Sequence, residues 1–430
     1  MNLTWYGSKT GAPSPRERGQ GKRIKIAVPS GGFAGAVLRA FSEMDPLSLT
    51  SFLTDFAAVA DPRLDRRKQY PLLEILLLCV AAGISGYQEW EAIADFGRLK
   101  LAWLRQYLPY ANGIPSHDTV NRVMGLLDLR QVERCLVQWS TRTVVLPSGA
   151  HLCFDGKCLR RSVTAHQAQT AHAQGGRTAV TLLHAWCDEA GLCLGQYETE
   201  RKVNEPRVLP DLLALLDVRG CVVSADAGFT QPATAAALTQ AGADYVLALK
   251  RRQQQLYAAT QAAFAQASTA DCWDEPAEKP RHARHETRRC RVLPASVLSD
   301  ALRGRWPRLQ ALVEVQTTRT PTKPMPHTPQ PAMPAVQTRY YLTSLAVPAA
   351  TLLGLVRRHW GIENRLHWVL DVVLGEDQSR KRAGQAAANY AAVRKLVLRL
   401  LQALPEKISF QRKLNQCALS DDYRHKCLRF

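Results

Sequence analysis

The chain has 430 residues, with 56 Lys and Arg against 37 Asp and Glu, a formal charge of +19 and a pI near 9.7. That length predicts two or three folding units, and the basic excess favours a polyanionic partner. Nucleic acid ranks ahead of an anionic membrane, because no basic amphipathic membrane helix stands out. Eleven cysteines without a CxxC motif predict reduced thiols in a cytoplasmic protein and disfavour a structural zinc site.

The first segment, residues 1–45, is rich in Gly, Ser, Pro, Lys and Arg and has neither helical nor strand periodicity, which predicts a disordered basic arm. Residues 46–146 then turn helical, with apolar residues at spacings of three and four. The longest apolar run, 71–87, is interrupted by Glu74 and is too short to cross a bilayer comfortably. It predicts a buried helix, and no membrane partner is expected.

The segment 114–124 is the most informative part of this helical region. Ser116 is a good helix N-cap, Asp118 suits the positive helix start, and Arg122 projects from the next turn. Together with the preceding helix at 90–96, the segment predicts either a helix-turn-helix that enters a DNA groove or a plain helical bundle with a capped helix. On either interpretation the region is expected to help bind DNA.

At His151 the periodicity changes to that of strands. Strands are expected at 151–154, 179–187, 192–199, 221–224 and 245–249, with helices at 207–216 and 231–241. This order predicts a ribonuclease H-like fold, an α/β arrangement in which helices cover a mixed sheet and the first strand lies beside the fourth. Asp155 and Asp226 would then lie side by side at neighbouring strand ends.

Residues 251–346 interrupt this pattern and are expected to form a β-rich insertion. They hold a basic stretch at 279–291 and a Pro-rich loop at 320–334. Strand-like segments occur at 289–293, 309–317 and 338–342. We therefore expect 147–405 to form one domain that carries this insertion, and 406–430 to form a basic tail.

The stretch 357–382 combines an apolar helical stripe with a line of polar groups. The apolar positions, which should face a core, are Ile362, Leu366, Val369, Leu370 and Val373. The polar line on another side is Glu363, His367 and Asp371. Trp360 and Trp368 flank Glu363 and predict that its carboxylate is sheltered, whereas the alternative is a solvated helix face.

Three acidic residues from distant segments thus converge: Asp155, Asp226 and Glu363. Oxygen-only ligands suit Mg²⁺ or Mn²⁺, and a pair of such ions supports in-line attack on a phosphodiester. Each residue alone has a structural explanation, as a turn or surface residue, but their joint placement favours catalysis. The row His359, Glu363 and His367 indicates zinc only weakly, because no third Cys or His lies nearby.

Several motifs follow one another in a single collinear order. They are FDGK at 154–157, ADAGF at 225–229, GADYVLALK at 242–250, HARHETR at 282–288 and HWGIENRLHWVLDV at 359–372, followed by GED. Upstream of them come DPR at 61–63, YPLLEILLL at 70–78 and GIPSHDT at 113–119. Together these motifs resemble the DDE transposases of bacterial insertion sequences, of the H-repeat-associated type, over roughly residues 46–403.

The resemblance implies a ribonuclease H-like catalytic core with a β-rich insertion, preceded by an all-α N-terminal domain, in a bacterial protein of the cytoplasm and nucleoid. It implies Mg²⁺ or Mn²⁺ as cofactor, DNA cleavage at the element's terminal repeats, strand transfer into target DNA, and a homo-oligomer on the DNA. The metal-binding catalytic triad would be Asp155, Asp226 and Glu363. Phosphate contacts are expected from Lys157, Arg160, Arg161, Lys250, Arg284, Arg288, Arg357 and Arg122.

The chain departs from the wider superfamily's signature of Tyr, Arg, Glu and Lys. Those places hold Val356, His359, Glu363 and Leu370, so only the glutamate fits. Arg357 or Arg358 is expected to supply the phosphate contact of the missing signature arginine. His367 or Arg380 is expected to supply that of the missing signature lysine. Two alternatives to a transposase remain open: a nuclease that cuts without joining, and an inactive remnant that only binds DNA.

Overall fold

The computed structural model describes residues 48–142, 144–163, 178–199, 205–268, 270–275, 284–321 and 335–428. All of them belong to one compact unit, Asp45–Phe430. The basic arm expected at 1–45 lies outside the described residues, and so does the Pro-rich loop expected at 320–334 except for Thr320 and Pro321. Within the described ranges, every helix is too short or too polar to cross a bilayer.

The described chain begins with helices whose starts follow the capping rules. Ser48, Ser116 and Asp128 each accept a backbone N–H with the side chain, which satisfies an otherwise unpaired donor. The elements are α2 (Leu49–Phe56), η2 (Asp65–Arg67), α3 (Leu72–Ile84), α4 (Trp90–Leu99), α5 (Leu101–Leu104), α6 (His117–Leu126) and α7 (Leu129–Thr141). Helix α3 is buried along nearly its whole length, which confirms the buried helix predicted from the apolar run.

The helices expected to form a helix-turn-helix, α4 and α6, do contact each other. A helix-turn-helix joins its helices by a turn of about three or four residues. Here α4 ends at Leu99, α6 begins at His117, and α5 lies between them. The helix-turn-helix interpretation is therefore wrong in its simple form, and the alternative of packed helices with a capped α6 describes these residues.

Five strands form the first part of a large mixed sheet. They are β1 (His151–Cys158), β2 (Thr181–Cys187), β3 (Leu192–Thr199), β4 (Val222–Ala225) and β5 (Asp244–Leu249), in the order β3-β2-β1-β4-β5. Strand β1 pairs with β2 antiparallel and with β4 parallel, with Phe154 opposite Ala225. The predicted adjacency of the first and fourth strands is thus confirmed, and Asp155 and Asp226 follow this matched pair.

The expected β-rich insertion extends the same sheet. It contains α11 (Gln254–Gln266), β6 (Asp271–Glu275), β7 (Arg284–Pro294), η4 (Ala295–Val297), α12 (Asp300–Arg303), β8 (Ala311–Pro321) and β9 (Ala335–Thr343). Strand β9 pairs antiparallel with β5, and β8, β7 and β6 follow, which gives one nine-stranded sheet. The three predicted strand segments are confirmed as β7, β8 and β9, whereas α11 and β6 were not predicted.

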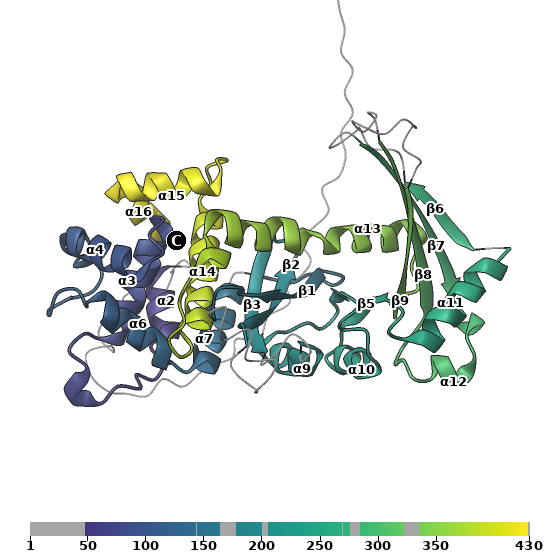
Figure 1. Cartoon of the computed structure of the whole chain (residues 1–430), viewed down its shortest axis with the longest axis horizontal. Helices are drawn as coiled ribbons and strands as arrows, with labels where there is room; N and C mark the ends of the chain where they lie inside the picture. Colours follow the sequence, from purple (N-terminus) through teal and green to yellow (C-terminus); the bar gives the residue numbers. More distant parts are fainter. Residues whose placement is uncertain are drawn as a thin grey trace, which may run out of the picture. The chain divides into compact units, whose positions relative to one another are not determined.

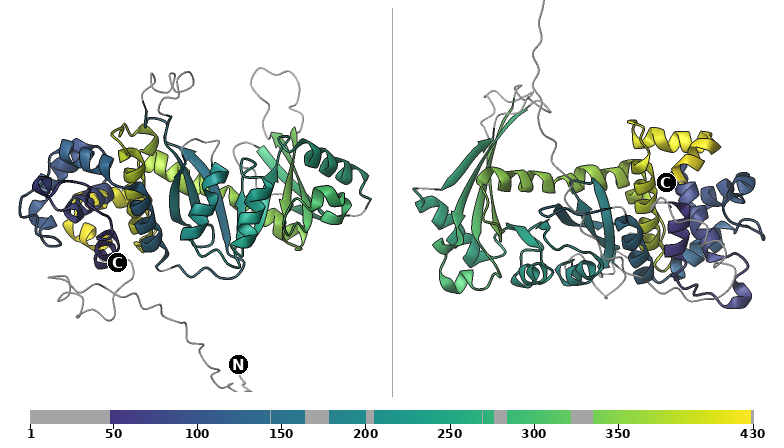
Figure 2. Two further views of the ribbon diagram at one scale, coloured as in Figure 1. Left: turned by 90° about the horizontal axis from the view of Figure 1, so that it is seen from below. Right: turned by 180° about the vertical axis from the view of Figure 1, so that it is seen from behind.

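Helices cover both faces of the sheet, as Figures 1 and 2 show. Helices α9 (Glu205–Leu215) and α10 (Pro232–Gln240) pack on one face around Phe154, Leu212 and Leu238. On the other face lies α13 (Ala349–His359), whose Leu352 and Val356 pack against strand residues of β4, β5 and β9. The helix continues in π-helical form through η5 (Ile362–His367) and η6 (Val369–Val373).

The C-terminal elements complete the helical block around α3. They are η7 (Glu376–Gln378), α14 (Ala386–Ala403), α15 (Phe410–Leu419) and α16 (Asp421–Leu428). Helix α14 packs on α3, α6 and α7, so both ends of the described chain share one core. The stretch 406–430 was expected to be a basic tail, but its described residues form two helices with Leu414, Cys417 and Arg424 buried.

Candidate active site

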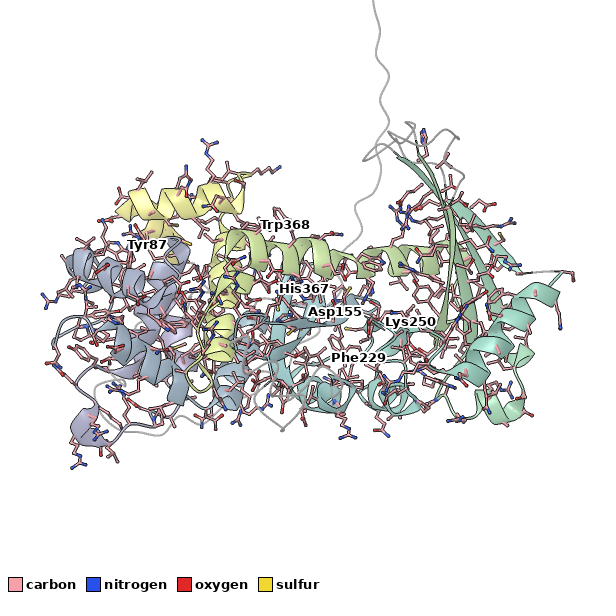
Figure 3. The ribbon with its side chains drawn as sticks, in the orientation of Figure 1. Tyr87, Asp155, Phe229, Lys250, His367 and Trp368 are labelled. Atoms are coloured by element: carbon pink, nitrogen blue, oxygen red, sulfur yellow. The ribbon has the colours of Figure 1, made fainter. Side chains whose placement is uncertain are left out.

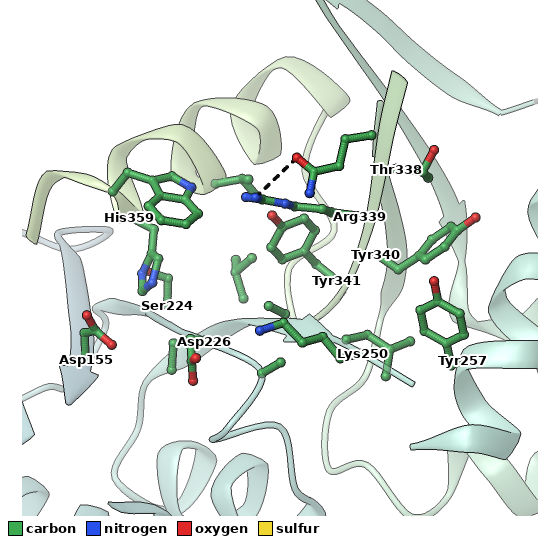
Figure 4. A pocket seen from close by; sticks show the side chains of 18 of the residues that line it. Asp155, Ser224, Asp226, Lys250, Tyr257, Thr338, Arg339, Tyr340, Tyr341 and His359 are labelled. Carbon is green, nitrogen blue, oxygen red and sulfur yellow. Dashed lines mark hydrogen bonds between the residues drawn. The ribbon is translucent and has the colours of Figure 1, made fainter. Parts of the chain in front are cut away.

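A cavity of about 590 Å³ lies where the sheet meets the helix α13 and its π-helical continuation. The structure brings the three predicted carboxylates to it: Asp155 from β1, Asp226 after β4 and Glu363 from η5. Asp155 and Asp226 lie near one end of the cavity, while Tyr257 and Tyr340 lie at the other (Figure 4). Three segments distant in sequence therefore share one concave site.

Asp155 is contacted by groups from two elements, β1 and η5, and a third element lies behind the second. Its Oδ1 accepts the backbone N–H of Gly156 at 2.9 Å, and its Oδ2 lies 3.6 Å from Nδ1 of His367. The Nε2 of His367 is in turn 3.0 Å from Nδ1 of His184, which is the cross-strand neighbour of Asp155 on β2. Figure 3 shows His367 and Asp155 close together below the η5 helix. Burial lowers the pKa of His367 to about 4 and that of His184 well below its usual value, so both are neutral at pH 7.

Asp226 is fixed by the tight turn that follows β4. Its Oδ1 accepts the N–H of Gly228 at 2.7 Å, and a Cβ at position 228 would lie only 3.0 Å from that same oxygen. Glycine thus permits the close approach that orients the carboxylate. The turn leaves Asp226 facing the cavity beside Ala227, which also lines it.

A hydrogen-bonded row lies beneath the Asp226 turn. Ser224 Oγ is 2.7 Å from Nε2 of His151 and 2.8 Å from Nδ1 of His359, which ties β4 to both β1 and α13. Burial lowers the pKa of His359 to about 4, with Asp226 opposing the shift, and the pKa of His151 to about 3. No pattern in the sequence predicts this row, because only folding brings the three residues together.

Glu363 reaches the cavity from the exposed side of the π-helix, while the predicted apolar stripe packs into the core. Ile362, Leu366, Val369 and Leu370 are buried and Val373 is partly buried, as predicted. The expected shelter from tryptophan is wrong. Trp360 is 40% exposed and Trp368 is 55% exposed, and Glu363 is itself exposed.

The zinc interpretation of the row His359, Glu363 and His367 is also wrong. His359 bonds to Ser224 and His367 to His184, so the two imidazoles point to different partners. Among the described residues, no three His, Cys, Asp or Glu side chains close around one point. The carboxylates of the cavity are hard oxygen donors, the ligand type that suits Mg²⁺ or Mn²⁺, but among the described residues these three do not close around one point either.

Basic and aromatic residues also form part of the cavity wall. Lys250 was predicted as a phosphate contact and lines the cavity, and so do Arg251 and Arg339, which were missed. Arg339 lies 5.1 Å from the centre of the Trp360 ring, a cation–π contact. Five consecutive residues of β9, 337–341, line the cavity, so strand alternation does not single out its basic residue and could not have identified this wall.

Lys157, another predicted phosphate contact, is buried in an ion cluster and does not line the cavity. Its Nζ lies 2.6 Å from Asp371, 3.1 Å from Asp377 and 3.7 Å from Glu376. Although burial alone lowers the pKa of Lys157, these acids raise it overall, so the ammonium stays charged and paired. Lys395 bonds Glu376 from the other side at 3.0 Å. The cluster fastens β1 to the end of the π-helix.

Two further predicted phosphate contacts, Arg288 and Arg357, form ion pairs with Glu275 of β6. Arg288 pairs with Glu275 and Glu286 and is 18% exposed, and Arg357 pairs with the same Glu275. Arg357 therefore joins α13 to the insertion through Glu275, whereas Arg288 pairs within the insertion, and neither presents a free cation.

The other predicted contacts whose side chains are described lie outside the cavity lining. Arg160 and Arg161 are exposed after β1, and Arg160 pairs with Asp377 at 3.3 Å. Arg122 is exposed on α6, and Arg284 is the first residue of β7, where only its backbone is described. Arg358, an alternative for the missing signature arginine, pairs with Asp188 at 3.2 Å. Of the eight predicted contacts, Lys250 alone lines the cavity among the described side chains.

Comparison with known proteins gives two family matches that together cover most of the chain. The profile described as "Transposase DDE domain" matches residues 147–400, and "DDE_Tnp_1-associated" matches 53–140. The chain is 31% identical over 386 residues to "Putative transposase YncI" of Escherichia coli O157:H7, covering 89% of this chain and 95% of that protein. It is 29% identical over 382 residues to "H repeat-associated putative transposase YhhI" of Escherichia coli K12, covering 88% and 97%.

Among solved structures, a piggyBac transposase synaptic complex with hairpin DNA aligns with a TM-score of 0.42 at 10% identity, over 88% of this chain and 78% of that one. The matched profile spans more than half of the chain, and YncI is covered almost completely. The chain therefore belongs to the DDE transposase family, and its relatives include H repeat-associated putative transposases.

Proposed function

We propose that this chain is a divalent-metal-dependent DNA transposase that cleaves phosphodiester bonds at the ends of an insertion sequence and transfers the strands into target DNA. The observation that carries the proposal is the convergence of Asp155, Asp226 and Glu363 on one cavity in a member of the DDE family. The strand order β3-β2-β1-β4-β5, with parallel β1, β4 and β5, supports a ribonuclease H-like core.

The three carboxylates would hold Mg²⁺ or Mn²⁺ and act as the catalytic triad. The chemistry that such ions supply when bound is activation of the attacking oxygen and stabilisation of the leaving one. The chain's own part is orientation. The N–H groups of Gly156 and Gly228 each hold one oxygen of a carboxylate, Asp155 and Asp226 respectively, which keeps both carboxylates in a fixed direction.

The basic wall would position the DNA strand. Lys250, Arg251 and Arg339 line the same cavity as the carboxylates, so a phosphodiester bound there would meet both cations and metal ligands. We assign the helical region 46–146 to recognition of the element ends, the core 147–405 to catalysis, and a homo-oligomer to the pairing of two ends.

The test is cleavage of labelled DNA that carries the element's own two ends, with Mg²⁺ or Mn²⁺, by the native chain and by Glu363→Gln. We expect the native chain to nick at the ends and the variant to bind the same DNA without cutting. Cutting without joined products in a strand-transfer assay would identify a nuclease instead. End binding that persists in chelator, with no cleavage under either metal, would identify a DNA-binding remnant.

A further inference from the structure

The imidazole of His367 links two parts of the site that come from different segments. It lies four residues after Glu363 on the same π-helical segment, and its Nδ1 is 3.6 Å from Oδ2 of Asp155 on β1. Its side chain is 13% exposed, so water competes little for this contact. No other step of the proposed reaction uses His367.

The hydrogen-bonding partners decide which nitrogen of His367 carries a proton. Behind His367 lies His184, whose Nε2 is buried and has no hydrogen-bond partner among the described residues. A proton there would be a buried donor without an acceptor, so His184 carries its proton on Nδ1 and donates it to Nε2 of His367. The proton of His367 then sits on Nδ1, facing Asp155.

Protonation of His367 would leave its Nδ1–H facing Asp155. An imidazolium carries a proton on both nitrogens, so Nδ1–H still faces the carboxylate, whereas a bare Nδ1 would set a lone pair against the negative oxygen. Asp155 therefore accepts a hydrogen bond from Gly156 at Oδ1, and the Nδ1–H of His367 faces Oδ2 at 3.6 Å, an electrostatic contact longer than a hydrogen bond.

We propose that His367 is a positioning residue, which uses Nδ1–H to fix the carboxylate of Asp155 relative to Glu363 and so sets the affinity of the site for a divalent cation. The inference rests on the proposed function, since it assumes that Asp155 and Glu363 share a metal. Partners that orient metal ligands in this way commonly change metal affinity by about 10- to 100-fold when they are removed.

A matched pair of substitutions at position 367 separates the effect of the N–H donor's position from the effect of losing the imidazole ring. The amide nitrogen of Asn reaches the place of Nδ1, whereas that of Gln reaches the place of Nε2. We therefore expect His367→Asn to keep the donor to Asp155 and His367→Gln to lose it. A third variant, His184→Leu, removes the group behind His367 from a different strand and tests the same link if the 367 variants fail to fold.

The measurement is the dissociation constant of Mn²⁺ from the purified full chain, from the electron paramagnetic resonance signal of free Mn²⁺, alongside the half-saturating Mn²⁺ concentration for end cleavage. His367→Gln should raise both about 10-fold or more, while His367→Asn stays within about 3-fold of the native chain. A chain whose thermal unfolding is unchanged but whose Mn²⁺ affinity falls has lost positioning and not its fold.

Two results would overturn the inference. One is Mn²⁺ affinity that is the same in the native chain, His367→Gln and His184→Leu, while the native chain still binds Mn²⁺ and cuts DNA; the proposed function would then survive alone. The other is an equal loss in His367→Asn and His367→Gln. If the native chain neither binds Mn²⁺ nor cuts, the proposed function and this inference fail together.

Discussion

At the scale of single residues, the site depends on short contacts that orient charged groups. Gly228 donates its N–H to Asp226 and leaves no room for a side chain, while Ser224 sits between His151 and His359 and joins three elements. Asp155 and Asp226 were recognisable in the sequence because each follows a predicted strand. Ser224 and His151 were not, because neither carries a motif of its own.

Replacing Gly228 by alanine should impair cleavage without unfolding the chain. The added Cβ would lie 3.0 Å from Oδ1 of Asp226, closer than ordinary contacts, so the carboxylate or the turn must shift. We expect end cleavage to fall by about 10-fold or more, since a shifted ligand weakens the metal site. Gly354→Ala is the control. Gly354 lies within helix α13, and the nearest atom to a Cβ added there would be 3.9 Å away. Equal activity in both variants would contradict the prediction.

The buried His151 should make the protein less stable as pH falls below 6.5. Its pKa is lowered by burial from 6.5 to about 3, so between these values the unfolded chain binds a proton that the folded chain does not. The contribution of neutral His151 to the free energy of unfolding is therefore fully present above pH 6.5. It is lost as the pH falls from 6.5 toward 3, by up to about 1.4 kcal/mol per pH unit.

Urea unfolding of the native chain and of His151→Gln between pH 7 and pH 4.5 measures this contribution to the free energy of unfolding. The variant should lose less stability over that interval than the native chain. Parallel pH profiles would show that His151 does not titrate as its burial predicts.

At the scale of elements, periodicity predicted the strands of the core and the adjacency of β1 and β4, which is what placed two carboxylates together. The π-helical winding of 362–373 was not predictable, because a π-helix shares the apolar pattern of an α-helix over so short a stretch. The burial of Lys157 was equally hidden, since its partner Asp371 lies 214 residues away.

The ion cluster around Lys157 should matter for stability. Lys157 is 7% exposed, so Lys157→Met would leave buried acids without their shared cation, at a cost of about 3–5 kcal/mol in the free energy of unfolding. Arg160→Met is the matched control, because Arg160 pairs with the same Asp377 but is 80% exposed, and should change stability by less than about 1 kcal/mol. Chemical denaturation of both variants checks this. A similar small change in each would mean that the cluster contributes little.

At the scale of the whole molecule, the sheet, its insertion and the helical segment that carries Glu363 line one cavity that holds both acids and cations. Net charge predicted a nucleic-acid partner but not where it binds, because many of the arginines proposed as contacts are paired internally. Arg288 and Arg357 pair with acids of the insertion, whereas Lys250 and Arg339 line the cavity.

This difference predicts which cations control the salt dependence of DNA binding. Lys250→Gln and Arg339→Gln should each reduce the slope of log K against log salt by about 0.9 if each neutralises one phosphate of duplex DNA. Arg288→Gln should leave the slope unchanged, since that guanidinium already pairs with two carboxylates. Titrations of end DNA at several salt concentrations measure the slopes. A reduction in Arg288→Gln equal to that in Lys250→Gln would place the DNA elsewhere.

The measurement that bears most directly on the proposed function compares the native chain with Glu363→Gln on labelled DNA carrying the element's two ends, in Mg²⁺ or Mn²⁺. Glu363 and the two aspartates line one cavity, so we predict that the native chain nicks at the ends and that the variant binds equally well without cutting. End cleavage by Glu363→Gln at the native rate would contradict a catalytic role for the triad.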